Sequence, residues 1–459
     1  MKDEICHVTR HSAGSEALLI AAPASNSGKT LVTLALLALM RKRGVDVAAA
    51  KVGPDYIDPA FHAAASGREC LNLDPWAMGR GELAARLAMA AGDAELLLVE
   101  GVMGLFDGAA GGGGSTAELA EMFSLPVVLV VDCSRQGQSV AALVGGFANF
   151  RPAVKVAGVI LNRVASERHG EMLSRAIEEA TGIPVVGRMP RRAEMELPAR
   201  HLGLVQAGEH PDLEGLLERA AEMAAEHIAL CRLANLTRPL ATDAGGNAGD
   251  AAGNAPHPQA LPPLGQRLAV ARDEAFAFCY PHMLADWRRA GAEMSFFSPL
   301  ADEAPPEDCD AVFLPGGYPE LHAGKLAAAG RFMEGLRQAA ERGALVYGEC
   351  GGFMVLGEEL SDERGEAHAM AGLLPLRSSL VRRRLHLGYR VLEHSSPLPF
   401  PRRLRGHEFH YATVTGQGEA PALFAARDAR GEELPPMGLR RGKVCGSFAH
   451  VICAAPEDG

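Results

Sequence analysis

One cysteine of the chain lies between a glutamate and two glycines, in the stretch YGECGGFMVLG at residues 347–357. An apolar run precedes the cysteine and a second run follows it, which predicts a strand, a tight turn and a helix. A thiol at a helix N-terminus experiences partial positive charge, which favours the thiolate. A lone cysteine is more often a small core residue, so Cys350 needs a base and oxyanion donors to be a candidate nucleophile.

A candidate base and candidate oxyanion donors both occur in the same half of the chain as Cys350. His450 stands at the end of the apolar run GSFAHVI and could act as the base. The stretch FLPGGYPEL offers the backbone N–H groups of Gly316 and Gly317, and Gly351 offers another beside the thiol. We therefore predict Cys350 and His450 as catalytic residues, with the three glycines as donors to an oxyanion.

A phosphate-binding loop is indicated near the start of the chain, in APASNSGKT at residues 22–30. Its last residues match the end of the pattern GxxxxGK[ST], whereas Pro23 stands at the first glycine position. Lys29 could reach the β- and γ-phosphates, and the Thr30 hydroxyl could bind magnesium. Asn162, which ends a later strand-like run, could pair with the edge of adenine or could simply be a turn residue. The predicted ATP-binding residues are Ser27, Gly28, Lys29, Thr30 and Asn162.

Four carboxylates follow predicted strands in the same half. Asp55 and Asp58 lie in KVGPDYIDPAFH, and Glu100 and Asp107 lie in LLLVEGVMGLFDG. Because parallel strands end at one edge of a sheet, these acids should converge near the phosphate loop, although any one of them could be a helix cap. Magnesium prefers such oxygen ligands. We predict a metal set of Thr30, Asp55 and Glu100, and a substrate-activating set of Lys51, Asp55, Asp58 and Asp107.

Two α/β domains are needed to position these groups. Apolar runs alternate with helix-like stretches over residues 15–230, which indicates a parallel sheet covered on both faces. A stretch rich in Gly, Ala, Asn and Pro follows, and a second alternating series comes after it. The predicted organisation is an N-terminal P-loop domain over 1–234, a flexible linker over 235–265 and a C-terminal α/β domain over 266–459.

The composition narrows the class of protein. A length of 459 residues and a hydrophobic content of 48% fit two well-packed domains. The net charge of −11 disfavours nucleic acid as a partner. No apolar run reaches the roughly 20 residues of a membrane span, and the N-terminus lacks the apolar centre of a signal peptide, so we expect a cytoplasmic protein with no membrane partner. The nine scattered cysteines predict free thiols.

The N-terminal half resembles the amination domain of the cobyrinic acid a,c-diamide synthase family, itself similar to dethiobiotin synthetase. The stretches that carry the resemblance are APASNSGKT, KVGPDYIDPAFH, LNLDPWAM and VEGVMGLFDG. The resemblance implies that the acids matching Asp55, Asp58, Glu100 and Asp107 serve magnesium, ATP and substrate activation. The family commonly has glycine where this chain has Asn26, and asparagine tolerates a left-handed backbone comparatively well.

Residues 266–455 resemble the class I glutamine amidotransferase domain of the cobyrinic and cobyric acid synthase group. The resemblance implies that the cysteine attacks the amide carbon of glutamine, forms a thioester and releases ammonia. Many class I glutaminases carry an acid two positions after the histidine, where this chain has Ile452. A dyad, or an acid from elsewhere, should therefore orient His450. Glu349 adjoins the cysteine, but neighbouring residues on a turn often point apart, so we assign it no catalytic role.

A further stretch, RGHEFHYA at residues 405–412, also matches the family. His407, Glu408 and His410 within it are interpreted as contacts to substrate or to the domain junction. Buried structural hydrogen bonding is an alternative that the residues leave open.

Together the two halves predict an ATP- and glutamine-dependent amidation. Phosphorylation by ATP with Mg²⁺ would turn an unreactive carboxylate into an acyl phosphate, which ammonia from the second domain would attack. The resemblance implies a corrin-ring acceptor, cobyrinate, amidated on its a and c acetate side chains. Hydrogenobyrinate and nickel sirohydrochlorin remain alternative acceptors, and cobyric acid synthase fits less well. A P-loop switch ATPase, the alternative from another class, would need neither Cys350 nor His450. The oligomeric state is left open.

Overall fold

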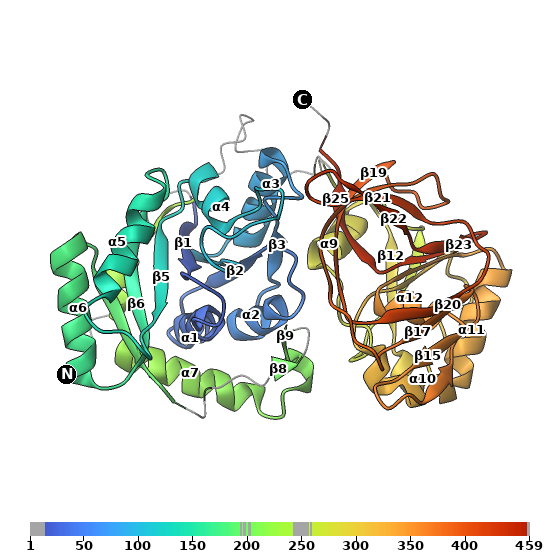
Figure 1. Ribbon diagram of the computed structural model, residues 1–459, viewed down its shortest axis with the longest axis horizontal. Coiled ribbons are helices and arrows are strands. Elements are labelled where there is room, and N and C mark those ends of the chain that lie inside the picture. Colours follow the sequence, from blue (N-terminus) through green and yellow to red (C-terminus); the bar gives the residue numbers. More distant parts are fainter. Residues whose placement is uncertain are drawn as a thin grey trace. The chain divides into compact units, whose positions relative to one another are not determined.

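The computed structural model of the chain (Figure 1) describes residues 14–192, 195, 199–200, 203–241, 257 and 259–456. Its residues form two compact units. The first comprises the described residues between 14 and 241 other than 109–112. The second comprises residues 109–112 and the described residues from 257 onward.

The first unit is built on a parallel sheet. Its strands run in the order β3-β2-β4-β1-β5-β6-β7, and a short strand, β10, pairs antiparallel with β1. The central strands are almost wholly buried and apolar, as expected when both faces of a parallel sheet are covered. The strand bounds are β1 (Glu16–Ala21), β2 (Val47–Val52), β3 (Leu71–Leu73), β4 (Leu96–Glu100), β5 (Val127–Asp132), β6 (Val156–Val164), β7 (Val185–Pro190) and β10 (Arg238–Pro239), with a separate hairpin of β8 (Ala199–Arg200) and β9 (Gly203–Leu204).

Helices alternate with these strands along the chain (Figure 1). Several begin at residues that cap helix N-termini, because side-chain oxygens there accept otherwise unpaired N–H groups; Ser115, Ser166 and Asp212 all do so. The helix bounds are α1 (Lys29–Lys42), α2 (Asp58–Ser66), α3 (Arg80–Ala91), α4 (Thr116–Met122), α5 (Val140–Phe150), α6 (Glu167–Thr181), α7 (Leu213–His227) and α8 (Leu230–Ala234), with a 3₁₀ turn η2 (Ala207–Glu209).

The second unit contains three sheets. A six-stranded sheet has the order β12-β11-β13-β14-β24-β23 and is parallel except at β23. Its bounds are β12 (Glu293–Phe297), β11 (Arg267–Ala271), β13 (Ala311–Leu314), β14 (Leu345–Glu349), β24 (Val444–Ser447) and β23 (Leu439–Arg441). The other two sheets comprise β16 (Ala367–Ala369), β15 (Glu359–Ser361), β17 (Leu376–Ser379) and β20 (Thr413–Gln417), and β22 (Glu433–Met437), β21 (Phe424–Arg427), β18 (His386–Glu393), β19 (Arg403–His410) and β25 (Ala449–Ala454).

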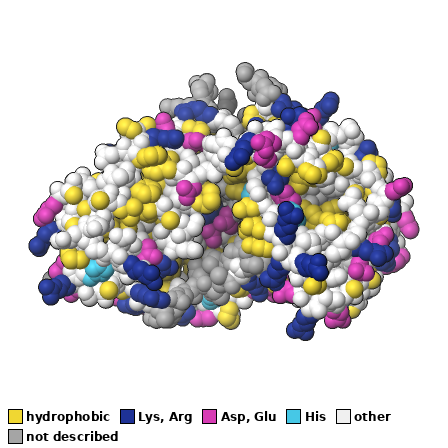
Figure 2. Space-filling view, viewed as in Figure 1, with side chains coloured by type: hydrophobic (Ala, Val, Ile, Leu, Met, Phe, Trp, Pro, Cys, Tyr) yellow, Lys and Arg dark blue, Asp and Glu magenta, His cyan; other side chains and the backbone are white. Residues whose placement is uncertain are grey.

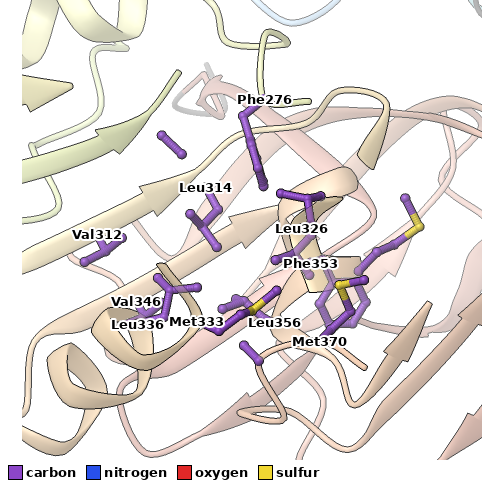
Figure 3. Packing of buried hydrophobic residues seen from close by; sticks show 14 of the residues in the cluster. Phe276, Val312, Leu314, Leu326, Met333, Leu336, Val346, Phe353, Leu356 and Met370 are labelled. Carbon is purple, nitrogen blue, oxygen red and sulfur yellow. The ribbon is translucent and has the colours of Figure 1, made fainter. Parts of the chain in front are cut away.

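A continuous apolar core supports the six-stranded sheet. Figure 3 shows Val312 and Leu314 of β13 and Val346 of β14 packed near Phe353 and Leu356. The last two belong to a short helix, α12, whose side chains are all buried. Close packing of this kind holds the residue before α12 in a fixed position. The helices of this unit are α9 (Pro281–Arg289), α10 (Ala323–Ala328), α11 (Gly330–Glu341) and α12 (Gly351–Leu356), with 3₁₀ turns η3 (Pro299–Ala301) and η4 (Pro319–His322).

The α/β prediction is confirmed for both halves, and the second half carries mixed as well as parallel pairing. Much of the predicted linker, residues 242–256 and 258, lies outside the described residues. The sequence predicts that the linker is flexible from residue 235 onward. Near its start, however, Arg238–Pro239 form β10 and pair with the first sheet. Its end is anchored too, because Gln259 Nε2 donates to the carbonyl of Ala454 at 2.6 Å.

The structure shows the charge pattern on one face of the molecule and the state of the described cysteines. Figure 2 shows acidic and basic side chains interspersed on the face in view. Among the described helices, none is both long enough and apolar enough to cross a membrane. Eight cysteines fall within the described residues, and all eight are free thiols.

Candidate active sites

The loop between β1 and α1 has the backbone of a phosphate cradle. Gly28, which caps α1, has φ of 91°, and Asn26 has φ of 63°, so both are left-handed. Asn26 adopts the conformation expected of it. Lys29 and Thr30 open α1, where first-turn N–H groups lack helical partners and can bind phosphate oxygens.

Two residues at the end of β6 hold this loop in place. Asn162 Nδ2 donates to the carbonyl of Ser27 at 2.9 Å, and Arg163 Nη1 donates to that of Asn26 at 2.9 Å. A Cβ on Gly28 would lie 2.1 Å from Asn162 Nδ2, so only glycine fits at that position. The structure thus gives Asn162 a supporting contact that the sequence did not suggest. Its role toward adenine stays a prediction.

A lysine and two carboxylates meet beside the loop. Lys51 on β2 is the register partner of Glu100 on β4, and Lys51 Nζ lies 2.7 Å from Glu100 Oε1 and 2.6 Å from Asp58 Oδ2. The Thr30 hydroxyl lies 2.9 Å from Glu100 Oε1 and 3.2 Å from Asp58 Oδ2. The adjacent strands β2 and β4, together with the first turns of α1 and α2, therefore bring together four of the predicted groups.

Burial and charge set the protonation of this cluster. Burial would lower the pKa of Lys51, but the charges of Asp58 and Glu100 raise it well above its ordinary value. Burial would likewise raise the pKa of Glu100, but Lys51 and His62 hold it well below the usual range. For Asp58, burial and the nearby charge of Asp55 raise the pKa to about 7. The positive charge of Lys51 thus offsets the negative charges of Asp58 and Glu100.

His62 belongs to this cluster and was missed by sequence reasoning. Its Nε2 lies 2.7 Å from Glu100 Oε2, and both side chains are completely buried. His62 follows Asp58 by four residues on α2, a spacing that places both on one helix face. This four-residue spacing was the sequence signal that could have identified His62.

The two remaining acids lie farther out. Asp55 Oδ1 accepts the N–H groups of Ile57 and Asp58, and Asp55 Oδ2 is 3.7 Å from Lys51 Nζ. Asp107 is exposed, and its Oδ2 accepts the N–H of Gly104 at 2.8 Å. Asp58, rather than Asp55, is thus the aspartate in direct contact with the Thr30 hydroxyl.

Lys29 reaches over the loop that follows β4. Its Nζ donates to the carbonyl of Met103 at 2.6 Å. Burial lowers the pKa of Lys29, although the charges of Glu100, Asp58 and Asp107 act in the opposite direction. An anionic phosphate in the adjacent cradle would restore the ordinary preference for the charged form.

The oxygen donors beside the loop suit magnesium. The Thr30 hydroxyl lies within hydrogen-bonding distance of the carboxylates of Asp58 and Glu100, and Mg²⁺ prefers hard oxygen ligands of this type. The donor set therefore fits the ion that the sequence predicts, with Asp58 as a further candidate ligand beside the predicted Asp55.

Cys350 stands on a strained turn between β14 and α12. Its φ of 47° and ψ of −102° are unusual for a residue with a side chain, and such strain is concentrated at functional sites. The N–H of Cys350 donates to the carbonyl of Ser447 on β24 at 2.8 Å, which fixes the turn to the sheet. The predicted strand, turn and helix are therefore present.

Gly316 lies against both predicted catalytic residues. A Cβ built on it would lie 3.0 Å from His450 Nε2 and 3.3 Å from the Cβ of Cys350. A Cβ on Gly351 would lie 3.0 Å from the backbone nitrogen of Gly317. Cys350, His450 and the three predicted oxyanion glycines thus lie close together.

Glu349 corrects an expectation about the turn. The sequence interpretation has it pointing away from the site, yet Glu349 Oε2 lies 3.5 Å from His450 Nδ1. Glu349 is the last residue of β14, and its Oε1 accepts the N–H of Val451 on β25, which keeps the side chain beside the histidine strand. An acidic side chain therefore lies near His450 Nδ1, although position 452 holds isoleucine.

The resting thiol is protonated, contrary to the expectation from the helix terminus. Burial first, and then the charges of Glu320, Glu408 and Glu349, raise the pKa of Cys350 well above its ordinary range. The N–H of Gly351 acts in the opposite direction but is outweighed. Ionisation thus requires a base within the site.

The stretch at residues 405–412 forms β19 and pairs directly with the histidine strand. His407 is the register partner of His450, and burial together with the charge of His450 lowers the pKa of His407 to about 3. Glu408 accepts hydrogen bonds from Arg390 and contacts His410 Nε2 at 2.9 Å. Buried hydrogen bonding thus describes Glu408 and His410, whereas His407 Nδ1 is buried without a hydrogen bond to any described residue. Contact of these residues with substrate stays a prediction.

These two constellations define a class of enzyme in which a nucleotide-dependent carboxyl activator is joined to a glutaminase. Residues 18–205 match the family described as the CobQ/CobB/MinD/ParA nucleotide binding domain. Residues 267–458 match the CobB/CobQ-like glutamine amidotransferase domain.

Curated relatives match nearly the whole chain. A hydrogenobyrinate a,c-diamide synthase of Brucella anthropi is 57% identical over 95% of this chain and 98% of its own length. Enzymes of the same name from Sinorhizobium sp. and Rhodobacter capsulatus are 54% and 53% identical, over 95% and 96% of this chain and 99% of each relative. The chain belongs to the a,c-diamide synthase family. It is a glutamine-dependent amidating ligase that uses ATP, acting on small-molecule substrates.

Proposed function

We propose that the acceptor is hydrogenobyrinate, whose a and c acetate carboxylates are converted to amides during cobalamin biosynthesis. The near full-length identity to relatives named for this cobalt-free substrate supports the choice. The family resemblance alone implied cobyrinate, with hydrogenobyrinate and nickel sirohydrochlorin as alternatives. The observation that carries the reaction type is the pairing of two assembled sites, the acid cluster at Thr30 and the Cys350 turn, in one chain.

The first unit activates the carboxylate. A carboxylate resists nucleophilic attack because it is negatively charged and lacks a leaving group, and transfer of the γ-phosphoryl group of ATP removes both obstacles. The N–H groups of the loop and Lys29 hold the phosphates, while Lys51 offsets negative charge at the acids. Mg²⁺, held by Thr30, Asp58 and Glu100, would neutralise charge on the phosphoryl oxygens.

The second unit supplies ammonia. The proton of the Cys350 thiol passes to His450 Nε2, and the sulfur attacks the amide carbon of glutamine. N–H groups of Gly317 and Gly351 stabilise the oxyanion, and its collapse expels ammonia, which takes the proton from His450. Water then cleaves the thioester to give glutamate and the free thiol. Ammonia displaces phosphate from the acyl phosphate, forming the amide.

Acceptor assays test this proposal. Purified enzyme is incubated with ATP, Mg²⁺ and glutamine together with hydrogenobyrinate, cobyrinate or nickel sirohydrochlorin. We expect mass spectrometry to show two carboxyl-to-amide conversions with hydrogenobyrinate, coupled to ADP and glutamate formation. Faster conversion of another macrocycle would reassign the acceptor, and absence of any coupled amide product would overturn the reaction type.

A further inference from the structure

We propose that Glu349 is the positioning residue of the glutaminase site, orienting His450 and balancing its charge in place of the acid absent at Ile452. The proposal deepens the proposed function and rests on it for the identity of the reaction. It begins with geometry: Glu349 Oε2 and His450 Nδ1 are 3.5 Å apart, and each side chain is only 2% exposed. Catalytic hydrogen bonds are often longer than ordinary ones before substrate binds.

The carboxylate of Glu349 is itself held in place. Its other oxygen, Oε1, accepts the hydroxyl of Tyr347 at 3.0 Å and the N–H of Val451 at 3.0 Å. Burial, and then the charge of Glu349, raise the pKa of Tyr347 well above its ordinary value, so its hydroxyl remains a donor. With Oε1 engaged twice, Oε2 is directed at the imidazole. β14, the strand that leads directly to Cys350, therefore ends with Glu349, the residue that faces His450.

The chemistry of the step explains why an acid is needed. When the Cys350 proton reaches Nε2, His450 becomes an imidazolium in a buried site, and an uncompensated buried charge is costly. A carboxylate at Nδ1 offsets that charge and fixes the tautomer in which Nε2 is free to accept the proton. Without it, proton transfer from a thiol whose pKa is raised would be less favourable.

Other ionisable groups lie near Glu349 and His450, and their effects must be distinguished from that of Glu349. On β19, burial and the charges of His450 and Arg390 lower the pKa of His407, the register partner of His450, to about 3. Glu408 has a pKa of about 2, because the charges and hydrogen bonds of His410 and Arg390 outweigh burial. The charge of Glu320 on η4 raises the pKa of Cys350. Glu349 differs from these groups in that its Oε2 lies 3.5 Å from His450 Nδ1.

Glu349→Gln is the central test, with exposed Glu358→Gln as the matched control. We expect Glu349→Gln to lower the kcat for glutamate release at least about tenfold, with little change in the KM for glutamine. Loss of the negative charge should also move the acidic limb of the kcat/KM profile to lower pH, because an adjacent carboxylate raises the pKa of an imidazolium. Glu349→Asp should recover part of the rate.

Amidation from ammonium chloride separates the possible failures. It should proceed at the wild-type rate in Glu349→Gln, which shows that the chain is folded and that the ATP site works. If the wild-type enzyme forms no amide from ammonia, the proposed function fails, whereas the glutaminase comparison still tests Glu349. A wild-type rate and pH profile in Glu349→Gln would overturn the proposal. Should that variant not fold, Tyr347→Phe, which frees Oε1 but keeps the carboxylate charge, should lower kcat by a smaller factor without moving the acidic limb, and an unchanged kcat would equally overturn the proposal.

Discussion

Lys51 and Glu100 face each other across adjacent parallel strands, with Lys51 Nζ 2.7 Å from Glu100 Oε1. The same carboxylate oxygen lies 2.9 Å from the Thr30 hydroxyl, so one atom links the phosphate loop to the lysine. This relationship makes Glu100 the centre of the first site and gives the first prediction.

Glu100→Gln should lower amidation from both glutamine and ammonia by about 100-fold or more, since it removes a charge that the metal and Lys51 both need. Amide formation with each nitrogen source measures the effect, and circular dichroism checks the fold. Glu121→Gln, at an exposed position, is the control. Unchanged turnover would remove Glu100 from the mechanism.

Cys350→Ala should abolish amidation from glutamine while leaving amidation from ammonium chloride intact. The reason is that only the former needs a nucleophile to release nitrogen. Product masses with the two nitrogen sources provide the measurement. Cys309→Ala, another buried cysteine of the same unit, should retain both activities. An equal loss with both sources would contradict the separation of the two sites.

The alkylation of Cys350 should depend on pH differently from that of an ordinary thiol. Because the pKa of Cys350 is raised, its thiolate forms only at more alkaline pH, and its reaction with iodoacetamide should keep increasing above pH 9. Peptide mapping of the modified cysteine, with a free cysteine peptide as the reference, gives the profile. Burial alone would slow the reaction at every pH without moving the profile. A plateau at or below pH 9 would contradict the protonated resting thiol.

Asn162→Ala should weaken ATP binding about tenfold, because it leaves the buried carbonyl of Ser27 without its donor and loosens the loop. Isothermal titration with ATP and Mg²⁺ measures the dissociation constant. Asn149→Ala removes an amide of the same size from an exposed helix position and should bind normally. Equal affinities of the two variants would show that the loop keeps its shape without Asn162.

The sequence predicted the elements and the order of the sites because both depend on local signals. Buried apolar strands and the helix that follows GKT are visible as runs of residues, and Lys51 and Glu100 end such runs. The pairing of Glu349 with His450 was not visible, since the two are 101 positions apart and meet only because β14, β24 and β25 are placed by the sheets.

The same limit applies to the first site. Choosing between Asp55 and Asp58 required knowing which of them caps the start of α2, and only the fold shows that Asp55 Oδ1 accepts two backbone N–H groups there. His62 needed the helix register to become visible. Residue types thus indicated the kind of chemistry, while the backbone geometry determined which side chains meet at the site.

Lys51 has a consequence for handling the protein. Acids crowded together normally repel one another unless a cation is supplied, and here the chain carries that cation permanently within the cluster. The apoenzyme should therefore survive prolonged treatment with EDTA with its melting temperature essentially unchanged, and readdition of magnesium should restore full turnover without a refolding lag.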